Sequence, residues 1–458
     1  MTGVQTCALP ICTREVAGLL HDFAEAFRSV GHEATSVIFE RNAFYPNLKY
    51  DVQLDQDVMH WRGRSAESSN PVVQAIRSAA ERGGRLGRLL QLMLTHDVFV
   101  YVWAGDSLRW NTELPYLRAM GKRIITVCCG SDVRHASAYG QEYADSIRAG
   151  TFKALRDLRS SERTKPVAFS LGNLRAAEWH SDVVLSQPNQ SGLAVRPYHH
   201  LFLPVDLSAF DSNIPGRAVP RVIHAPSSTG MKGSDLILPA LERLKSEGIA
   251  FDLQFLHGVS NAEVLRAMSQ ADVMVDQLHF PLHGKAGVEA MASGCALATC
   301  NREDYEPFPP SRPIWHIDSG NVYGQLRQLL TQRDLRVRLA QESLEYVGRY
   351  HDQQVVAQKI LDHLEESGTG ACDHFPSFFA RDYRLEEGAD IPQRLQRLTE
   401  RIVRRWGLPE GIDPKGMAAR GLMSWTDPNC RPDTWSALNR HSNARPNEAM
   451  ARTGWPES

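Results

Sequence analysis

A glutamate placed one turn inside a short helix, behind a loop that ends in glycine, is the clearest chemical signal in this sequence. Residues 271–294 read ADVMVDQLHFPLHGKAGVEAMASG; the apolar start predicts a buried strand, and 285–293 predicts a helix that ends at Gly294. The first N–H groups of a helix lack intrahelical partners and carry partial positive charge, so they bind phosphate well. Glu289 could then accept two hydrogen bonds from a sugar diol, and the alternative interpretation is a solvated helix residue.

A second loop has the composition of a phosphate cradle. The segment RVIHAPSSTGMKGSDLIL places PSSTGMKG between a predicted strand at 221–225 and a predicted helix at 234–247. Small polar residues leave the backbone N–H groups open to phosphate oxygens, and Lys232 adds a positive point charge. A solvated helix start is the alternative for Lys232. The candidate phosphate-binding residues are Ser227, Ser228, Gly230, Lys232 and Gly233.

Predicted strands and helices alternate along most of the chain, which indicates parallel sheets with ligand sites at the carboxyl ends of their strands. The N-terminal half has predicted helices at 15–30, 113–120 and 170–180 and strands at 34–39, 97–103, 122–127 and 183–186. The C-terminal half has predicted strands at 221–225, 251–257, 273–275 and 296–299 and helices at 234–247, 260–270, 285–293, 322–331, 334–350 and 352–366. Ser260 and Glu263 form a capping box. The fold class is therefore α/β, with two Rossmann-like domains, and the lack of a GxGxxG loop argues against a dinucleotide dehydrogenase.

Three motifs in this order resemble the nucleotide-sugar signature of GT-B-fold retaining glycosyltransferases, the family 4 type. The first is a strand, a glycine before a helix, and then EAMASG: Gly284, Glu289, Ala290, Met291, Ala292 and Gly294. The second is the Lys232-Gly233 pair, at the family's phosphate-binding Lys-Gly position. The third is LPVDLSAF at 203–210, which is similar to the family's interdomain segment and contains Val205-Asp206. The resemblance covers residues 13–366.

The resemblance implies two domains that face each other across a cleft. It also implies transfer of a sugar, with retention, from a UDP- or GDP-linked donor to an acceptor hydroxyl. The expected setting is cell-surface polysaccharide or glycoconjugate synthesis, with a glycan or lipid-linked acceptor. Lys232 and Glu289 would be the catalytic residues, Lys232 at the leaving diphosphate and Glu289 at the ribose. Further nucleotide-sugar contacts would come from His257, Gly258, His283, Gly284 and Lys285. The alternative for His257-Gly258 is a turn that ends a strand.

The turn after the predicted strand at 122–127 is the expected acceptor side. The sequence there is CCGSDVR, and its candidate residues are Gly130, Ser131, Asp132 and Arg134. Relatives often have His-Gly-x-Asp at this place, whereas this chain has Cys129 at the position of the histidine. The alternative is a tight turn that Asp132 caps. Further candidates to line the cleft lie downstream, at Arg196, Tyr198, His199 and His200. The alternative for each of them is a structural role.

Two departures from the family pattern lie on the donor side. An arginine commonly pairs with the phosphate-binding lysine, and Pro226 stands there; the first glutamate of the family's Glu-x7-Glu pattern is replaced by Pro281. These departures indicate a divergent subgroup or weakened catalysis. The alternatives are a nucleotide-sugar epimerase or hydrolase on the same fold, or a non-catalytic protein that binds nucleotide-sugars. His279 and His283 are four residues apart, but Pro281 breaks a helix between them, so neither a metal site nor a cofactor is expected.

Composition adds few constraints. The chain has 458 residues and a formal net charge of -2, which gives no general attraction to nucleic acid. No apolar run approaches the roughly 20 residues of a membrane helix. The 8 cysteines show no CxxC pair, which favours reduced thiols in a cytoplasmic protein.

Both ends differ from the rest of the chain. Residues 1–11, MTGVQTCALPI, resemble a translated sequencing adapter, so we expect 1–12 to be an artefact and the first strand and glycine loop to be missing. The predicted domains are 13–205 and 221–351, with a linker at 206–220, a crossover helix at 352–367 and a partly disordered extension at 368–458. A basic amphipathic helix at 392–406 could lie on the inner face of an anionic membrane or dock on its own domain.

Overall fold

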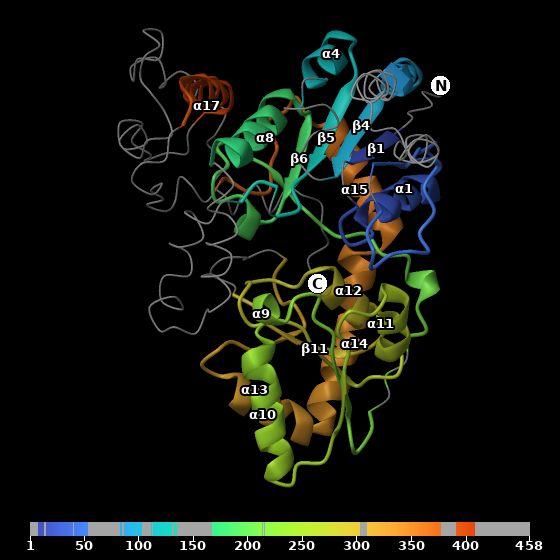
Figure 1. Ribbon diagram of the computed structural model, residues 1–458, viewed down its shortest axis with the longest axis vertical. Helices are drawn as coiled ribbons and strands as arrows, with labels where there is room; N and C mark the ends of the chain where they lie inside the picture. The colour runs from blue at the N-terminus through green and yellow to red at the C-terminus, as the bar shows by residue number, and fades with distance from the viewer. Residues whose placement is uncertain are drawn as a thin grey trace, which may run out of the picture.

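The computed structural model (Figure 1) describes the chain in two lobes, with the N-terminal elements above and the C-terminal elements below. The described residues are 8–12, 15–39, 41–53, 83–84, 87–102, 111, 113–130, 132–134, 167–212, 214, 216–302, 309–376 and 391–407. Ser131 lies outside these residues, and so do 377–390 and 408–458 of the extension that was predicted to be partly disordered.

The N-terminal lobe contains a seven-stranded parallel sheet among the residues that are described. In spatial order its strands are β3 (Val52–Gln53), β2 (Val37–Ile38), β1 (Ala8–Cys12), β4 (Val98–Val102), β5 (Arg123–Val127), β6 (Val183–Ser186) and β7 (His199–His200). Its helices include α1 (Leu19–Ser29), α4 (Leu114–Ala119) and α8 (Val167–His180). The predicted stripe of α1 is buried, with Leu20, Phe23 and Phe27 fully inside the core, because their spacing puts them on one helix face.

The prediction that the first strand and its glycine loop are missing is wrong. Strand β1 lies in the middle of the sheet, where Ile11 pairs with Val37 on one side and with Tyr101 on the other. A sheet position depends on backbone pairing, and this short run supplies it. The helix also begins later than predicted, at Leu19, so residues 15–18 lie in a loop before it. Gly18 ends this loop with a φ of 79°, a left-handed conformation that glycine adopts without strain.

The C-terminal lobe contains a five-stranded parallel sheet within the described ranges. The spatial order is β12 (Ile314–His316), β11 (Ala296–Thr299), β10 (Val273–Val275), β8 (Arg221–His224) and β9 (Asp252–Phe255). The helices are α9 (Thr229–Lys232), α10 (Ser234–Ser246), α11 (Asn261–Met268), α12 (Lys285–Ala292), α13 (Val322–Thr331) and α14 (Arg333–Tyr350). The predicted capping box is present, since Ser260 accepts from the Glu263 N–H and the Glu263 side chain accepts in return. The α/β class with two Rossmann-like sheets is thereby confirmed.

The order in which the chain adds strands to this sheet changes direction between the neighbouring strands β8 and β10. The chain runs outward from β8 to β9 on one side and from β10 to β11 and β12 on the other. In open parallel sheets, the loops that leave two such strands separate at their carboxyl ends and open a space where ligands bind. The loops concerned are 225–228, which leads into α9, and 276–284, which leads into α12. Both predicted donor motifs therefore leave the sheet at its topological switch point.

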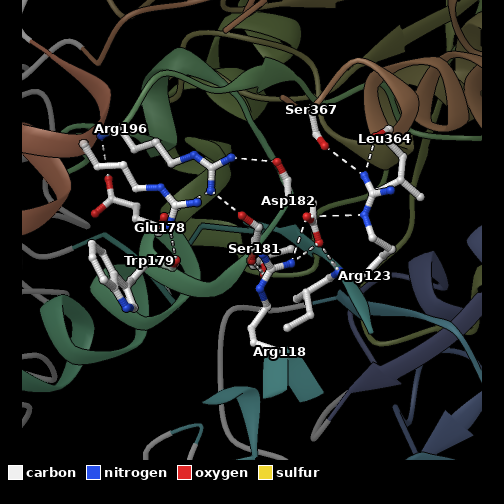
Figure 2. Close-up of polar contacts among 12 residues, drawn as sticks. Arg118, Arg123, Glu178, Trp179, Ser181, Asp182, Arg196, Leu364 and Ser367 are labelled. Carbon is white, nitrogen blue, oxygen red and sulfur yellow. Dashed lines mark hydrogen bonds and ion pairs between the residues drawn. The ribbon is translucent and has the colours of Figure 1, made fainter. Parts of the chain in front are cut away.

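Helix α15 (Gln353–Glu365) runs from the lower lobe into the upper one, where it packs beside α1 (Figure 1). Its end is held to the N-terminal sheet by Arg123 of β5, which donates to the Leu364 carbonyl and to Ser367 Oγ. Arg123 Nε also lies 3.3 Å from Asp182, and Arg118 donates to both oxygens of that carboxylate. Figure 2 shows this network, in which Asp182 contacts both Arg118 and Arg123.

Helix α17 (Gln393–Trp406) docks on α8 of the N-terminal domain (Figure 1). Leu395, Ile402 and Val403 are buried in one cluster with the apolar face of α8. Arg196 stacks on the Trp406 ring at 4.1 Å and donates to the backbone carbonyls of residues 178, 181 and 182. The structure thus supports the docked alternative for this helix, because its apolar side is already covered. No helix in the described ranges has the length and hydropathy to cross a membrane.

The docking of α17 predicts a measurable stability difference. Ile402→Ala should lower the free energy of unfolding by roughly 2–5 kcal/mol, because it leaves a cavity where the side chain is fully buried. Urea unfolding followed by circular dichroism measures this change. Arg401→Ala, at the exposed neighbouring position, is the matched control and should change it by less than about 0.5 kcal/mol. Equal stability of the two variants would contradict the docking.

Candidate functional site

An ion pair spans the switch point between β8 and β10. Lys232 Nζ lies 2.7 Å from Asp276 Oδ1 and donates to Gln277 Oε1 at 2.9 Å. Asp276 directly follows β10 and is 1% exposed, whereas the lysine side chain is 17% exposed. The second carboxylate oxygen, Asp276 Oδ2, is buried without a hydrogen-bond partner in the described structure. The lysine is therefore fixed at the sheet edge with its charge directed at the loop that precedes α12.

The loop that carries this lysine packs closely on the loop after β10. Gly233 has a φ of 78°, and a Cβ there would lie 3.0–3.1 Å from Leu278 and His279 atoms, so a larger residue would strain the backbone and push these neighbours aside. The Leu278 N–H donates to the Lys232 carbonyl at 3.2 Å, which joins the two loops. Residues 229–232 form the short helix α9, where a loop was expected. Ser227 and Ser228, just before α9, and Gly230 within it are all exposed.

Glu289 is buried on the face of α12 that turns toward the other domain. It is 4% exposed and accepts from Asn261 Nδ2 at 3.2 and 3.3 Å. Burial raises the pKa of this carboxyl to about 7, Lys285 opposes the rise, and Asp22 adds to it. The solvated-helix alternative for Glu289 is wrong, because its carboxylate lies inside the protein beside an amide donor. Near neutral pH the group is poised between its charged and neutral forms.

Lys285 joins the two domains at this point. Its Nζ lies 2.6 Å from Asp22 Oδ2 of α1 and donates to the Pro204 carbonyl at 2.8 Å. A second contact follows beside it, where the Asn261 N–H at the start of α11 donates to the Phe44 carbonyl of the N-terminal domain at 2.9 Å. Tyr45 is half-buried, and its pKa is raised by burial first and by Glu289 next. The N-terminal domain therefore covers the Glu289 side of the site.

The remaining donor-side candidates separate into buried and exposed positions. The His283 ring is buried against Tyr346 of α14 and lies 3.4 Å from the His351 ring, nitrogen to nitrogen, so it packs against the end of α14. Burial holds its pKa well below the usual value. His257 is exposed at the end of β9 with its ring parallel to Phe255, and Gly258 follows with a φ of 73°. Gly284 precedes α12, and a Cβ there would meet nothing within 4 Å.

On the acceptor side, the structure supports the capped-turn alternative for Asp132 and adds a contact between domains. The fully buried Asp132 carboxylate accepts from the N–H groups of Cys129 and Gly130, the latter at 2.6 Å. Gly130 has a φ of 132°, and a Cβ there would lie 2.7 Å from the Arg134 guanidinium. Arg134 in turn lies over the Phe280 ring at 5.3 Å. This contact brings the predicted acceptor turn to the loop that precedes α12.

Several site residues were not predicted from the sequence. Asp22, Tyr45, Asn261, Asp276 and Gln277 join the site through contacts with residues distant in sequence. Asp276 alone had a local signal, because it ends a buried strand. Within the described ranges, one group of histidine, cysteine and acidic side chains is close enough to share a metal ion, namely His199, His363 and Asp373, and it contains none of the donor-side residues.

Comparisons with known proteins place the fold. No protein-family model matches the chain, and no curated protein matches its sequence. Among solved structures, it is similar to sucrose-phosphate synthase from Thermosynechococcus elongatus, with a TM-score of 0.52 and 12% identity over 79% of this chain and 98% of that one. It is also similar to TarM, with a TM-score of 0.50 and 9% identity over 79% of this chain and 99% of that one. At these identities the similarity shows the fold, which is the two-domain GT-B arrangement.

The environment of Glu289 predicts a pH-dependent stability. A carboxyl whose pKa rises from 4.5 to about 7 on folding stabilises the protein fully below pH 4.5, and this contribution is lost as pH rises through 7. Glu289→Gln removes the charge, so the stability of the variant relative to the parent should rise from pH 4.5 and level off above pH 7, at about 3 kcal/mol by pH 8. Urea unfolding across this range measures the difference.

The control for this effect is Glu242→Gln, the same chemical change at an exposed position of α10. Its unfolding profile should follow that of the parent at every pH. A Glu289→Gln profile that also runs parallel to the parent would mean that this carboxyl titrates normally in the folded protein.

Proposed function

We propose that this protein is a glycosyltransferase that moves a sugar from a UDP- or GDP-linked donor to an acceptor hydroxyl, with retention at the anomeric carbon. The observation that carries the proposal concerns the two loops that leave the C-terminal sheet at its switch point. One leads into the helix that carries Lys232, and the other leads into the helix that carries Glu289. A nucleoside diphosphate needs a positive group for its phosphates and, close by, a hydrogen-bond acceptor for its ribose hydroxyls. The GT-B fold supports the proposal as the scaffold on which the motifs stand.

The leaving nucleoside diphosphate gains negative charge in the transition state, so fixed positive groups near its β-phosphate are the expected catalytic device. Lys232 supplies such a charge, and the first N–H groups of α12 and the backbone of the exposed residues Ser227 to Gly230 supply donors. Asp276 now holds the lysine. We infer that the diphosphate displaces this carboxylate from the ammonium, so the ion pair positions Lys232 until the donor binds.

Glu289 would bind the ribose hydroxyls as a carboxylate. Bound hydroxyls donate to its oxygens, which favours the charged form, and Asn261 can keep one of its present hydrogen bonds. Contacts of the N-terminal domain through Lys285 and Phe44 lie beside this carboxyl and would help to exclude water, which otherwise hydrolyses the donor. On the acceptor side, Arg134 and the turn at Gly130 would face the sugar that is transferred.

The acceptor and setting remain part of the proposal. A glycan or lipid-linked acceptor in cell-surface polysaccharide or glycoconjugate synthesis, in the cytoplasm or at the inner face of the membrane, is consistent with this site. No metal is required for departure of the diphosphate in this scheme. Any membrane contact would use the exposed arginines of α17 rather than its apolar face, because that face is covered by α8.

The ion pair of Lys232 also favours a second candidate, a non-catalytic protein that binds nucleotide-sugars. Pro226 and Pro281 remove two charged residues that the resembling family uses, and the remaining lysine is partly neutralised by Asp276. A panel of UDP- and GDP-sugars incubated with a set of sugar acceptors separates the candidates. Glycoside product supports the transferase, free or isomerised sugar supports a hydrolase or epimerase, and binding without turnover supports the non-catalytic protein.

Glu289 and Lys232 should fail differently when they are changed. Glu289→Gln should weaken nucleoside diphosphate binding about tenfold to a hundredfold, because charge-assisted hydrogen bonds to the ribose contribute roughly 1.5–3 kcal/mol. This loss should nearly vanish for a ligand without ribose hydroxyls. Lys232→Ala should weaken diphosphate much more than nucleoside and should lower turnover. Titration calorimetry with nucleoside, monophosphate and diphosphate measures all of these differences.

Lys245→Ala is the matched control for the lysine, because it removes the same charge from an exposed position of the same domain. It should leave all three affinities unchanged. Folded Glu289→Gln and Lys232→Ala proteins that bind the three ligands as tightly as the parent would remove the proposed donor site.

Asp276→Asn gives an independent test of the ion pair. The amide keeps the shape of the side chain but frees Lys232 and removes a negative charge near the phosphates, so diphosphate affinity should rise by up to about fivefold, or about 1 kcal/mol. Calorimetry at low and high salt should show a larger gain at low salt. A fall in diphosphate affinity would indicate that Lys232 and Asp276 act together as a structural pair.

A further inference from the structure

A second cluster of reactive side chains lies in the N-terminal domain, away from the donor motifs in sequence and on different elements. Its members are His199 of β7, His363 in the last turn of α15 and Asp373 of the segment that follows. All three are buried, with side chains that are 10%, 5% and 4% exposed. Three polar side chains from separate segments therefore converge inside the protein, where each needs a partner.

The distances within this cluster are too long for good hydrogen bonds. Asp373 Oδ2 lies 3.5 Å from His199 Nδ1 and 3.8 Å from His363 Nε2. His199 Nδ1, His363 Nδ1 and Asp373 Oδ1 are buried without a hydrogen-bond partner among the residues that the structure describes. The two imidazole rings are stacked, with centroids 3.6 Å apart. Hydrogen bonding alone thus leaves the cluster unsatisfied.

The same distances agree with the edges of a metal coordination shell. Two ligand atoms at about 2.0–2.1 Å from a tetrahedral zinc ion are about 3.3 Å apart. The two distances to the carboxylate are close to this value, and one ligand atom from each of the three residues lies within 4.8 Å of the others. In the stacked arrangement the in-plane lone pairs of the two imidazoles run nearly parallel, so one ring must rotate out of the stack for both to bind the same ion. The Asp373 carboxylate is already oriented, because the backbone N–H of His200 donates to its Oδ2 at 2.9 Å. Carboxylates that bind metals are typically held by such a hydrogen bond.

We propose that His199, His363 and Asp373 bind a zinc ion. Two imidazoles and one carboxylate suit zinc better than magnesium or calcium, which prefer all-oxygen shells. The ion would connect the edge strand of the N-terminal sheet, the end of the crossover helix and the start of the C-terminal extension. The backbone already joins two of these segments, since Tyr198 N–H donates to the His374 carbonyl at 3.1 Å. With three protein ligands the ion would keep a fourth position for water, and the site lies outside the donor-binding machinery.

The experiment uses the full chain, purified without a metal-affinity tag and dialysed against zinc and then against metal-free buffer. Elemental analysis should find roughly one zinc ion per chain. Zinc should raise the unfolding temperature of the chelator-treated protein, because binding to the folded state stabilises it by mass action. A parent protein that retains no zinc and shows no shift would overturn the proposal, whatever its variants do.

Variants assign the ligands. His363→Gln and Asp373→Asn should each weaken zinc binding more than about tenfold in competition with a chromogenic chelator, and both should lose the zinc-dependent shift in unfolding temperature. His316→Gln is the matched control, because His316 also pairs with an aspartate, Asp318, at 3.1 Å, but near the surface. It should bind zinc like the parent. Full zinc retention by folded His363→Gln and Asp373→Asn proteins would contradict the assignment.

Discussion

The bridge from Lys285 to Asp22 and Pro204 is the interaction on which the arrangement of this molecule most depends. One ammonium group at the start of α12 contacts a carboxylate of α1 and a backbone carbonyl of the segment between the domains. It is 9% exposed, and removal of one partner would leave a nearly buried charge unpaired, which is costly. The bridge therefore fixes how the first turn of α12 faces the N-terminal domain.

This position sets the electrostatics of the site. Glu289 lies one turn further along the same helix, so the contact that holds the domains together also buries its carboxyl and places Lys285 and Asp22 near it. Lys285 lowers the pKa of Glu289 and Asp22 raises it, while burial has the largest effect and raises it. A charged ligand that binds between Lys232 and α12 would therefore compete with two interactions within the protein. At Lys232 it competes with Asp276, and at Glu289 it competes with Asn261.

Local patterns predicted the fold well, because strands and helices with buried faces follow from periodicity. The capping box at Ser260, the helix after Gly284 and the strand that ends before Asp276 were all predicted from neighbouring residues. The short strands β3, β7 and β12 have too few residues for a period, and β1 was set aside because residues 1–11 resemble a translated sequencing adapter. The sequence motifs predicted Lys232 and Glu289 as site residues. They did not predict the partners of these residues, which are distant in sequence and come close only in the folded chain. Lys285 and Asp22 are 263 positions apart, so no sequence window contains both.

A crystal structure of the protein soaked with a nucleoside diphosphate would test the central claim most directly. The account predicts density for the nucleotide across the switch point between β8 and β10, with the diphosphate at Lys232 and the start of α12 and the ribose hydroxyls on Glu289. It also predicts that the distance between Lys232 Nζ and Asp276 increases from the present 2.7 Å when the phosphate binds. A nucleotide bound elsewhere, or a switch point without nucleotide at saturating concentration, would contradict it.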